Sequence, residues 1–127
     1  MRIISWNCNM AFRNKAKYLL EFDADIYVIQ ESEDTAKLNI AELTSYPNRI
    51  WIGKNKNKGL LVLAKENIKI ETYKEHNLNY KYILPLKVSG KCNFNMLAVW
   101  AQDDKENRRN QYIGQIWHAL QEYKLLI

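Results

Sequence analysis

The order of the expected elements predicts an α/β protein in which helices cover one face of a mixed β-sheet. Two strand–helix pairs open the chain, several strands with short connections follow, and a long helix lies near the end. A helix between two strands favours parallel pairing, whereas short connections favour antiparallel neighbours. No element is left over for the second face of this sheet, so we expect that face to be uncovered.

Strands and helices alternate in the first part of the chain. An apolar run that ends in polar residues is typical of a buried strand, and apolar residues at helical spacing are typical of a half-buried helix. Asp34 is suited to begin the second helix as its N-cap, and Pro47 follows the end of that helix. The expected elements are strand 2–7, helix 14–22, strand 25–31 and helix 34–43.

Strands dominate the next part, and one helix follows them. Apolar runs with short linkers predict strands 49–53, 59–64, 68–73, 80–88 and 93–101. Residues 106–123 predict a long helix with an apolar stripe of Tyr112, Ile113, Ile116, Trp117, Leu120 and Tyr123. Asp103 and Asp104 precede this helix, and capping of its N-terminus explains them better than metal binding does.

The composition indicates one ordered domain with a basic surface. The chain has 127 residues, of which 47% are hydrophobic and 12% aromatic, and this fits a single globular domain. Lys and Arg outnumber Asp and Glu by 19 to 14, and the resulting charge of +5 is suited to an anionic partner such as nucleic acid. Most of the cations are lysines spread along the chain, however, which favours a solvated surface. The densest group, in residues 54–59, is first of all a polar hairpin loop.

Several classes of protein are excluded. No window comes near the roughly 18 uncharged apolar residues that a membrane span needs. The first residues lack the pattern of a signal peptide, so we expect a cytoplasmic protein. Cys8 and Cys92 have no partner at short spacing, which argues against a disulfide framework and against a zinc site.

Two polar residues stand at strand ends where α/β proteins place ligands. Asn7 ends the first expected strand and Glu31 ends the second, and parallel pairing would bring both to the carboxyl edge of the sheet. A carboxylate beside an amide oxygen is suited to Mg²⁺, which takes few protein ligands and keeps several waters. The alternative is that Asn7 caps a turn and Glu31 is a solvated strand end, since polar residues are common there.

Five segments carry a resemblance to a known family. Residues 3–9 (IISWNCN) and 24–31 (ADIYVIQE) resemble the opening of the endonuclease/exonuclease/phosphatase superfamily, the deoxyribonuclease-I-like metal-dependent phosphodiesterases. Residues 57–62 resemble the family's glycine-led strand, residues 97–101 its central strand and residues 112–115 the helix that follows. The resemblance covers nearly the whole chain. It implies a deoxyribonuclease-I-like α/β fold, of which this chain would form one helix-covered mixed sheet, half of an α/β/β/α sandwich.

The resemblance also implies roles for individual residues. Glu31 would be the principal carboxylate ligand of a catalytic Mg²⁺ (or Mn²⁺), and Asn7 would help to hold the metal or its water. Asn9 and Trp100 would lie near the substrate. Many family members have an aromatic residue, often tyrosine, at the position of Trp100, and an indole is suited to packing or stacking there. Met10 stands where the nuclease members have glycine.

Other parts of the family pattern are absent from the sequence. The family chemistry relies on a Gly-Asp-x-Asn strand and on a later Asp-His pair, and His76 and His118 do not match that pair. The final residues, 125–127, stand where the Gly-Asp-x-Asn strand would begin. We therefore expect residues 1–127 to be the N-terminal half of such a domain and to be inactive as an isolated chain.

The expected partner follows from the same reasoning. The uncovered sheet face would pair either with a missing C-terminal half or with a second copy of the chain. In the second case the chain would be a catalytically dead, self-associating binding module of the same fold. Substrates of the family include nucleic acids and other phosphoesters, and the sequence does not choose between them.

Overall fold

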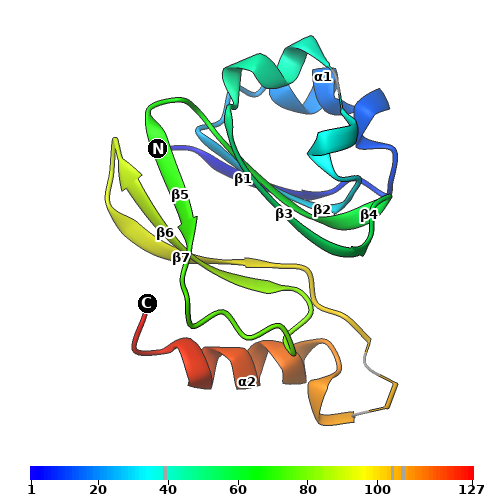
Figure 1. Ribbon diagram of the computed structural model, residues 1–127, viewed down its shortest axis with the longest axis vertical. Coiled ribbons are helices and arrows are strands. Elements are labelled where there is room, and N and C mark those ends of the chain that lie inside the picture. The colour runs from blue at the N-terminus through cyan, green and yellow to red at the C-terminus, as the bar shows by residue number, and fades with distance from the viewer. Residues whose placement is uncertain (39, 104, 107) are drawn as a thin grey trace.

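The computed structural model describes residues 1–38, 40–103, 105–106 and 108–127 (Figure 1). The strands are β1 (Ile3–Asn7), β2 (Ile26–Ser32), β3 (Asn48–Asn55), β4 (Lys58–Ala64), β5 (Ile68–Thr72), β6 (Ile83–Gly90) and β7 (Phe94–Val99). The α-helices are α1 (Ala16–Leu20) and α2 (Ile113–Tyr123), and short 3₁₀ helices lie at Phe12–Asn14, Thr35–Lys37, Ala41–Ser45 and Arg108–Asn110.

The strands form two sheets that are stacked face to face. The first sheet has the order β1-β2-β4-β3, and the second has the order β5-β6-β7. β1 and β2 are parallel and the other pairs are antiparallel, so the first sheet is mixed. α1 and the first three 3₁₀ helices lie outside the first sheet, and α2 with the 3₁₀ helix before it lies outside the second (Figure 1). The α/β class and the mixed sheet predicted from the sequence are confirmed.

The expectation of a single sheet with an uncovered face is wrong. A tight turn, in which the Ile68 N–H donates to the Lys65 carbonyl at 2.9 Å, leads the chain out of β4 and into a different sheet. The second sheet covers the inner face of the first, and the two share one apolar core. Connection lengths indicate which strands are neighbours, but they do not show where a run of strands leaves one sheet for another. Core residues from both sheets include Ile26, Val28, Val62, Ile70, Leu84 and Leu86.

A second apolar core lies between the first sheet and the helices outside it. Tyr27 at its centre is fully buried, and its hydroxyl donates to the Leu19 carbonyl at 3.0 Å. The expected helix 34–43 is instead two 3₁₀ helices, but Asp34 is the N-cap of the first, as predicted. Its carboxylate accepts from the Ala36 N–H at 3.0 Å.

The last helix is shorter than expected and packs on the second sheet. α2 begins at Ile113 with Tyr112 as its N-cap, so Asp103 does not cap it, and Asp104 lies outside the described residues. Ala119 and Tyr123 are buried against Ile83 of β6. Other members of the predicted apolar stripe are exposed, namely Tyr112, Ile113, Trp117 and Leu120.

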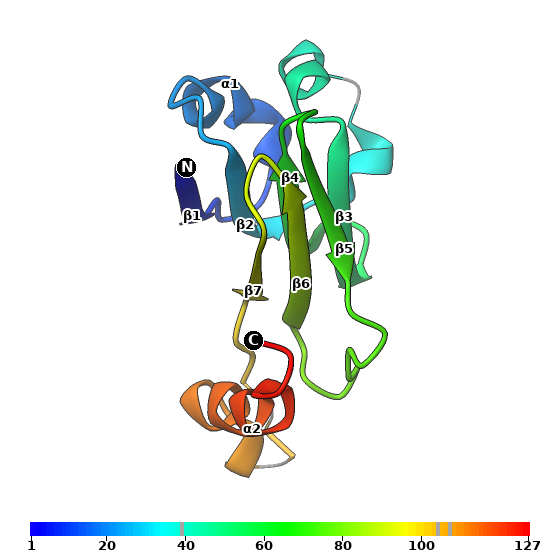
Figure 2. The same ribbon diagram turned by 90° about the vertical axis from the view of Figure 1, so that its left-hand side faces the viewer.

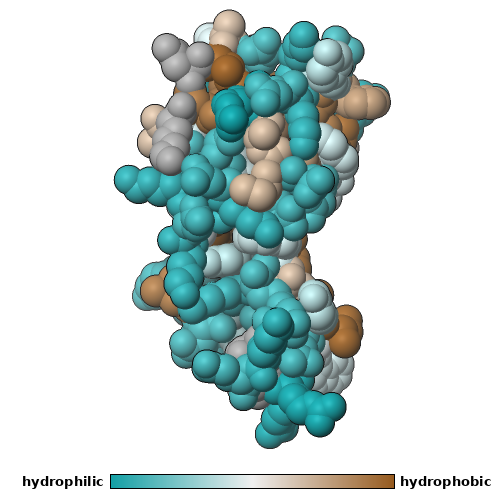
Figure 3. Space-filling view, turned by 90° about the vertical axis from the view of Figure 1, so that its right-hand side faces the viewer, coloured by the Kyte–Doolittle hydropathy of each residue, from teal (hydrophilic) through white to brown (hydrophobic). Residues whose placement is uncertain are grey.

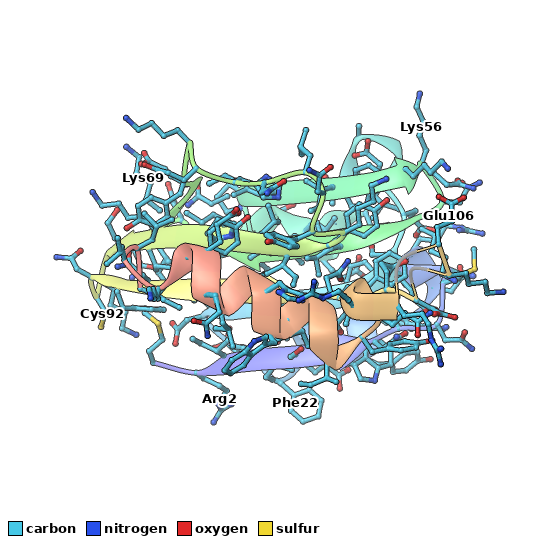
Figure 4. The ribbon with its side chains drawn as sticks, turned by 90° about the horizontal axis from the view of Figure 1, so that it is seen from below. Arg2, Phe22, Lys56, Lys69, Cys92 and Glu106 are labelled. Atoms are coloured by element: carbon cyan, nitrogen blue, oxygen red, sulfur yellow. The ribbon has the colours of Figure 1, made fainter. Side chains whose placement is uncertain are left out.

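On one side of the sandwich each sheet ends in an unpaired edge strand, and apolar residues are exposed there. β1 and β7 are edge strands, and both lie on the left of the molecule in Figure 2. α2 also lies toward the β1 side when the molecule is seen from below (Figure 4). We call this the open side, and define it by β1, β7 and the exposed residues Ile3, Trp6, Tyr18 and Phe22.

A membrane-spanning helix was also sought. None of the helices in the described residues has the length and apolar character to cross a bilayer.

Candidate metal site at the ends of β1 and β2

Parallel pairing of β1 and β2 places Asn7 and Glu31 at the same end of the first sheet. Asn7 lies opposite Gln30 in the register, and Glu31 is the next residue along β2. The pairing continues into the loop after β1, where the Cys8 N–H donates to the Gln30 carbonyl at 3.0 Å. Figure 3 shows this end of the molecule, whose surface is mainly hydrophilic.

Glu31 occupies a β-bulge in β2. Gln30 pairs with Leu60 and Ser32 pairs with Gly59, so Glu31 is an extra residue in the ladder. Its φ is 63°, in the left-handed region that side chains other than glycine rarely adopt. Strict alternation would turn Glu31 to the outer face with Ile29, and a bulge re-aims the side chain. Strain of this kind persists where the surrounding structure holds it, and it concentrates at functional sites.

Lys58 lies next to the Glu31 carboxylate and also near the ring of Trp100. The Lys58 ammonium is 3.9 Å from Glu31 Oε1 and 5.7 Å from the centre of the Trp100 ring. Trp100 in turn stacks on Tyr82, with ring centres 5.5 Å apart and an angle of 18° between the planes. Trp100 follows β7 and therefore brings the second sheet to the same end as Glu31. Gln30 joins the two sheets at this point, because its Nε2 donates to the Val99 carbonyl at 3.0 Å.

Gly59 lets β3 and β4 approach each other beside the bulge. A Cβ at Gly59 would meet the Ile52 carbonyl and the Trp51 ring at 2.5 Å, so only glycine fits. The Trp51 indole Nε1 donates to the Ser32 carbonyl at 3.0 Å, immediately after the bulge. The glycine that the sequence marked as the start of a strand therefore supports the position of Lys58 and of the residues that flank Glu31.

Asn7 and Asn9 form a turn at the end of β1. The Asn7 side-chain oxygen Oδ1 accepts from the Asn9 N–H at 3.0 Å, and both side chains are exposed. Asn7 thus does cap a turn, the alternative considered from the sequence. An amide oxygen has a second lone pair, however, so this hydrogen bond leaves Oδ1 able to bind a cation.

The donors at this end match the chemistry of a hard cation with a largely aqueous shell. The Glu31 carboxylate and the Asn7 amide oxygen are oxygen donors, and the side chain of Glu31 is 19% exposed. Within the described residues no group of three His, Cys, Asp or Glu side chains is placed to hold a metal. The donor set therefore suits Mg²⁺ or Mn²⁺, which need few protein ligands, and does not suit a structural zinc.

The cysteine next to the site is structural. Cys8 is buried, burial raises the pKa of its thiol, and Sγ donates to the Glu31 carbonyl at 3.3 Å. Neither histidine belongs to the site. Burial lowers the pKa of His76 in the loop between β5 and β6, and His118 lies in α2 outside the second sheet.

Two residues of this region were not selected from the sequence. Lys58 was treated as part of a polar hairpin, although it directly precedes the glycine of the predicted strand. Lys15 falls within the expected helix 14–22, and its ammonium binds the loop after β1. A lysine pattern alone carries no signal for either contact. The contact of Lys58 depends on a bulge in a distant strand, and that of Lys15 depends on the left-handed conformation of the loop after β1.

Comparisons with known proteins show the fold. No family model matches the chain, and no curated protein matches it. Among solved structures the chain resembles the 3′ phosphatase NExo from Neisseria, whose structure contains a product DNA hairpin. The TM-score is 0.54 at 18% identity, over 99% of this chain and 49% of that one. This likeness confirms the expected deoxyribonuclease-I-like fold, and the chain spans about half the length of that protein.

Proposed function

We propose that this chain carries the metal-binding half of a Mg²⁺-dependent phosphoester hydrolase and has little or no activity as an isolated chain. The observation that carries the proposal is the position of Glu31, whose backbone is strained in a bulge of β2 at the same strand end as Asn7. It lies at the end of the strands in a fold that a 3′ phosphatase shares. Ligands commonly bind at this edge of α/β sheets.

Each residue at this end has a role in the proposal. Glu31 is the principal ligand of Mg²⁺ (or Mn²⁺), and Asn7 contributes a second oxygen. When bound, the ion stabilises negative charge on the phosphoryl oxygens. Lys58 attracts the phosphate group, and Asn9 and Trp100 lie on the substrate side. Nucleic acid is the favoured substrate because the structural neighbour holds a DNA hairpin, and other phosphoesters are the alternative.

The proposed lack of activity rests on the missing general base. The sequence contains no Gly-Asp-x-Asn, and His76 and His118 lie outside the candidate site. Loss of a positioned base typically lowers the rate of such a reaction by about two to four orders of magnitude. We therefore assign binding of the metal to this chain and activation of water to residues that it does not contain.

The open side is the surface that we propose a second half of the domain covers. Two strand edges there leave backbone groups available for pairing, and large apolar side chains such as Trp6 and Phe22 are exposed beside β1. That the chain spans about half of its structural neighbour supports a completing half. The inner sheet face, through which self-association was expected, is already covered, so a second copy would have to use this same open side.

Calorimetric titration with MgCl₂ and MnCl₂ tests the metal part of the proposal. We expect weak, saturable binding by the wild-type chain, and a loss of affinity of about tenfold or more in Glu31→Gln. The matched control is Glu71→Gln, because Glu71 is an exposed carboxylate on β5 that only approaches Lys69, at 3.9 Å. Absence of binding by the wild type, or equal binding by Glu31→Gln, would contradict the proposal.

Hydrolysis assays test the second part. With Mg²⁺ and either bis(p-nitrophenyl) phosphate or a DNA hairpin that ends in a 3′-phosphate, we expect no turnover above that of the metal alone. Turnover that disappears in Glu31→Gln would overturn the claim of inactivity, although it would support the metal site. Turnover that is the same in the wild type and in Glu31→Gln comes from a contaminating enzyme. It is subtracted as background.

A further inference from the structure

The loop after β1 contains three consecutive residues in the left-handed conformation. The φ angles are 53° at Asn9, 70° at Met10 and 50° at Ala11, and none of the three is glycine. Each such residue costs on the order of 1 kcal/mol or more, so the loop persists only where other contacts hold it. Backbone in this conformation turns successive carbonyl groups toward one side of the loop.

A single ammonium group binds the carbonyls of this loop. Lys15 Nζ donates to the carbonyls of Cys8, Asn9 and Met10, and the last two distances are 3.3 and 2.9 Å. An ammonium has three N–H donors and the loop presents three acceptors, so donors and acceptors match one to one. Lys15 immediately precedes α1, whose Ala16 and Leu19 are buried in the core, and its backbone is therefore anchored.

The opposite side of the loop is bonded to the backbone of Glu31. The Met10 N–H donates to the Glu31 carbonyl at 3.1 Å, and Cys8 Sγ donates to the same oxygen at 3.3 Å. Glu31 is itself in the left-handed conformation. The Lys15 ammonium therefore closes a loop whose other side holds the strained peptide that aims the Glu31 carboxylate.

We propose that Lys15 is a positioning residue for the candidate metal site, because its ammonium group holds the three carbonyls of the loop together. Without the ammonium the three carbonyl dipoles converge on an empty space, and the loop relaxes toward ordinary backbone conformations. The hydrogen bonds to Glu31 then weaken, and its carboxylate loses its direction. The consequence for metal binding rests on the proposed function, whereas the consequence for the loop does not.

The direction in which the affinity for Mn²⁺ changes when Lys15 is removed separates a positioning role from a purely electrostatic one. Lys15 is positively charged, and removal of a cation near a metal site strengthens the binding of Mn²⁺ if charge alone matters. Positioning requires the opposite, a weaker site. Lys17 is the matched control, because it is a nearby exposed lysine whose ammonium lies 4.9 Å from the centre of the Tyr18 ring.

The first measurement is the affinity of the full chain and its variants for Mn²⁺, determined by electron paramagnetic resonance. We expect Lys15→Ala to bind about tenfold more weakly or worse, and Lys17→Ala to bind as the wild type does or slightly more tightly. Methylammonium chloride restores binding to Lys15→Ala because it supplies N–H donors, whereas tetramethylammonium at the same concentration does not. If Lys15→Ala fails to fold, Lys15→Met keeps the aliphatic chain and gives the same loss without rescue.

The second measurement needs no metal. In a Cys92→Ser background Cys8 is the remaining thiol, and its rate of labelling by a disulfide reagent reports opening of the loop. We expect Lys15→Ala to label faster than the wild type and methylammonium to slow it. Ile70→Val, a core change in the second sheet, controls for a general loss of stability.

The two measurements together have unambiguous outcomes. If the wild type binds no Mn²⁺ but Cys8 is labelled faster in Lys15→Ala and more slowly again with methylammonium, the proposed function fails and the positioning of the loop by Lys15 stands. If Lys15→Ala labels no faster than Lys17→Ala, or if the wild type binds Mn²⁺ and Lys15→Ala binds it as tightly, the positioning role is overturned.

Discussion

The Lys58 ammonium lies 3.9 Å from Glu31 Oε1, so the proposed metal ligand already faces a cation of the protein itself. A bound metal competes with this ammonium for the same carboxylate. The pair is partly exposed, and the free energy of interaction of such ion pairs is about 0.2–1 kcal/mol. Lys58 is thus expected to weaken metal binding modestly while it attracts the phosphate of a substrate.

Replacing Lys58 by methionine is therefore expected to raise the affinity for Mn²⁺ by about 1.4- to 5-fold, the factor to which that free energy corresponds. Isothermal titration calorimetry measures the change. Lys56→Met, at the exposed tip of the same hairpin, has the same change in formal charge and is expected to have a smaller effect. An affinity that falls in Lys58→Met would show that the lysine does not compete for Glu31.

The strain at Glu31 makes a prediction about stability. Glu31→Gly and Glu31→Ala both remove the carboxylate, but only glycine adopts a φ of 63° without strain. We expect the free energy of unfolding of Glu31→Gly to exceed that of Glu31→Ala by about 1 kcal/mol. The same pair of substitutions at Lys69, in the middle of β5, is expected to give the opposite order. Urea denaturation measures all four variants, and equal stability of the two Glu31 variants would contradict the assigned strain.

Acid sensitivity is expected from Asp25, which precedes β2. The Arg2 N–H donates to its carboxylate at 2.8 Å and Lys91 Nζ lies at 3.4 Å, and these contacts lower the pKa of Asp25 below its usual 3.8. A lowered folded pKa gives stability that is fully present above the unfolded value and is lost as the pH falls through the folded value. Asp25→Asn is therefore expected to destabilise the chain at neutral pH and to flatten the loss of stability below pH 4.

Urea denaturation at neutral pH and at low pH measures this dependence. Glu71→Gln is the control, because it removes an exposed carboxylate whose lysine partner is 3.9 Å away. An acid profile of Asp25→Asn that runs parallel to the wild-type profile would show that Asp25 does not contribute.

Exposed apolar residues on the open side predict self-association of the isolated chain. At tens of micromolar we expect the wild type to form dimers or larger species, because strand edges and large apolar side chains lie together there. Phe22→Lys is expected to reduce this association, whereas Leu78→Lys, a change at an exposed loop position, is not. Sedimentation velocity distinguishes these species. A monodisperse wild-type monomer at these concentrations would contradict the account of the open side.

Local signals in the sequence predicted much of the first half of the chain. The apolar run in residues 25–31 is β2, and Asp34 caps a helix, because burial patterns and side-chain caps depend on neighbours in the sequence. The alternation of apolar and polar residues also predicted the strand at β5, where Ile68 and Ile70 are buried and Lys69 is exposed.

Features that depend on distant contacts were not predictable. The departure of β5 from the first sheet, the late start of α2 and the bulge at Glu31 all follow from packing between segments far apart in the sequence. A glutamate gives no sign of a left-handed conformation. The contact of Lys58 with Glu31 also had no local signature, because a lysine pattern resembles a solvated surface whether or not its charges are used.

The most direct test of the central claim is the broadening of backbone amide signals by Mn²⁺ in a two-dimensional ¹H–¹⁵N spectrum of the chain. The account predicts that substoichiometric Mn²⁺ first broadens the amides around Asn7 and Glu31, and that Glu31→Gln removes this localised effect. Broadening that centres on another acidic region, or that is unchanged in Glu31→Gln, would contradict a metal site at the ends of β1 and β2.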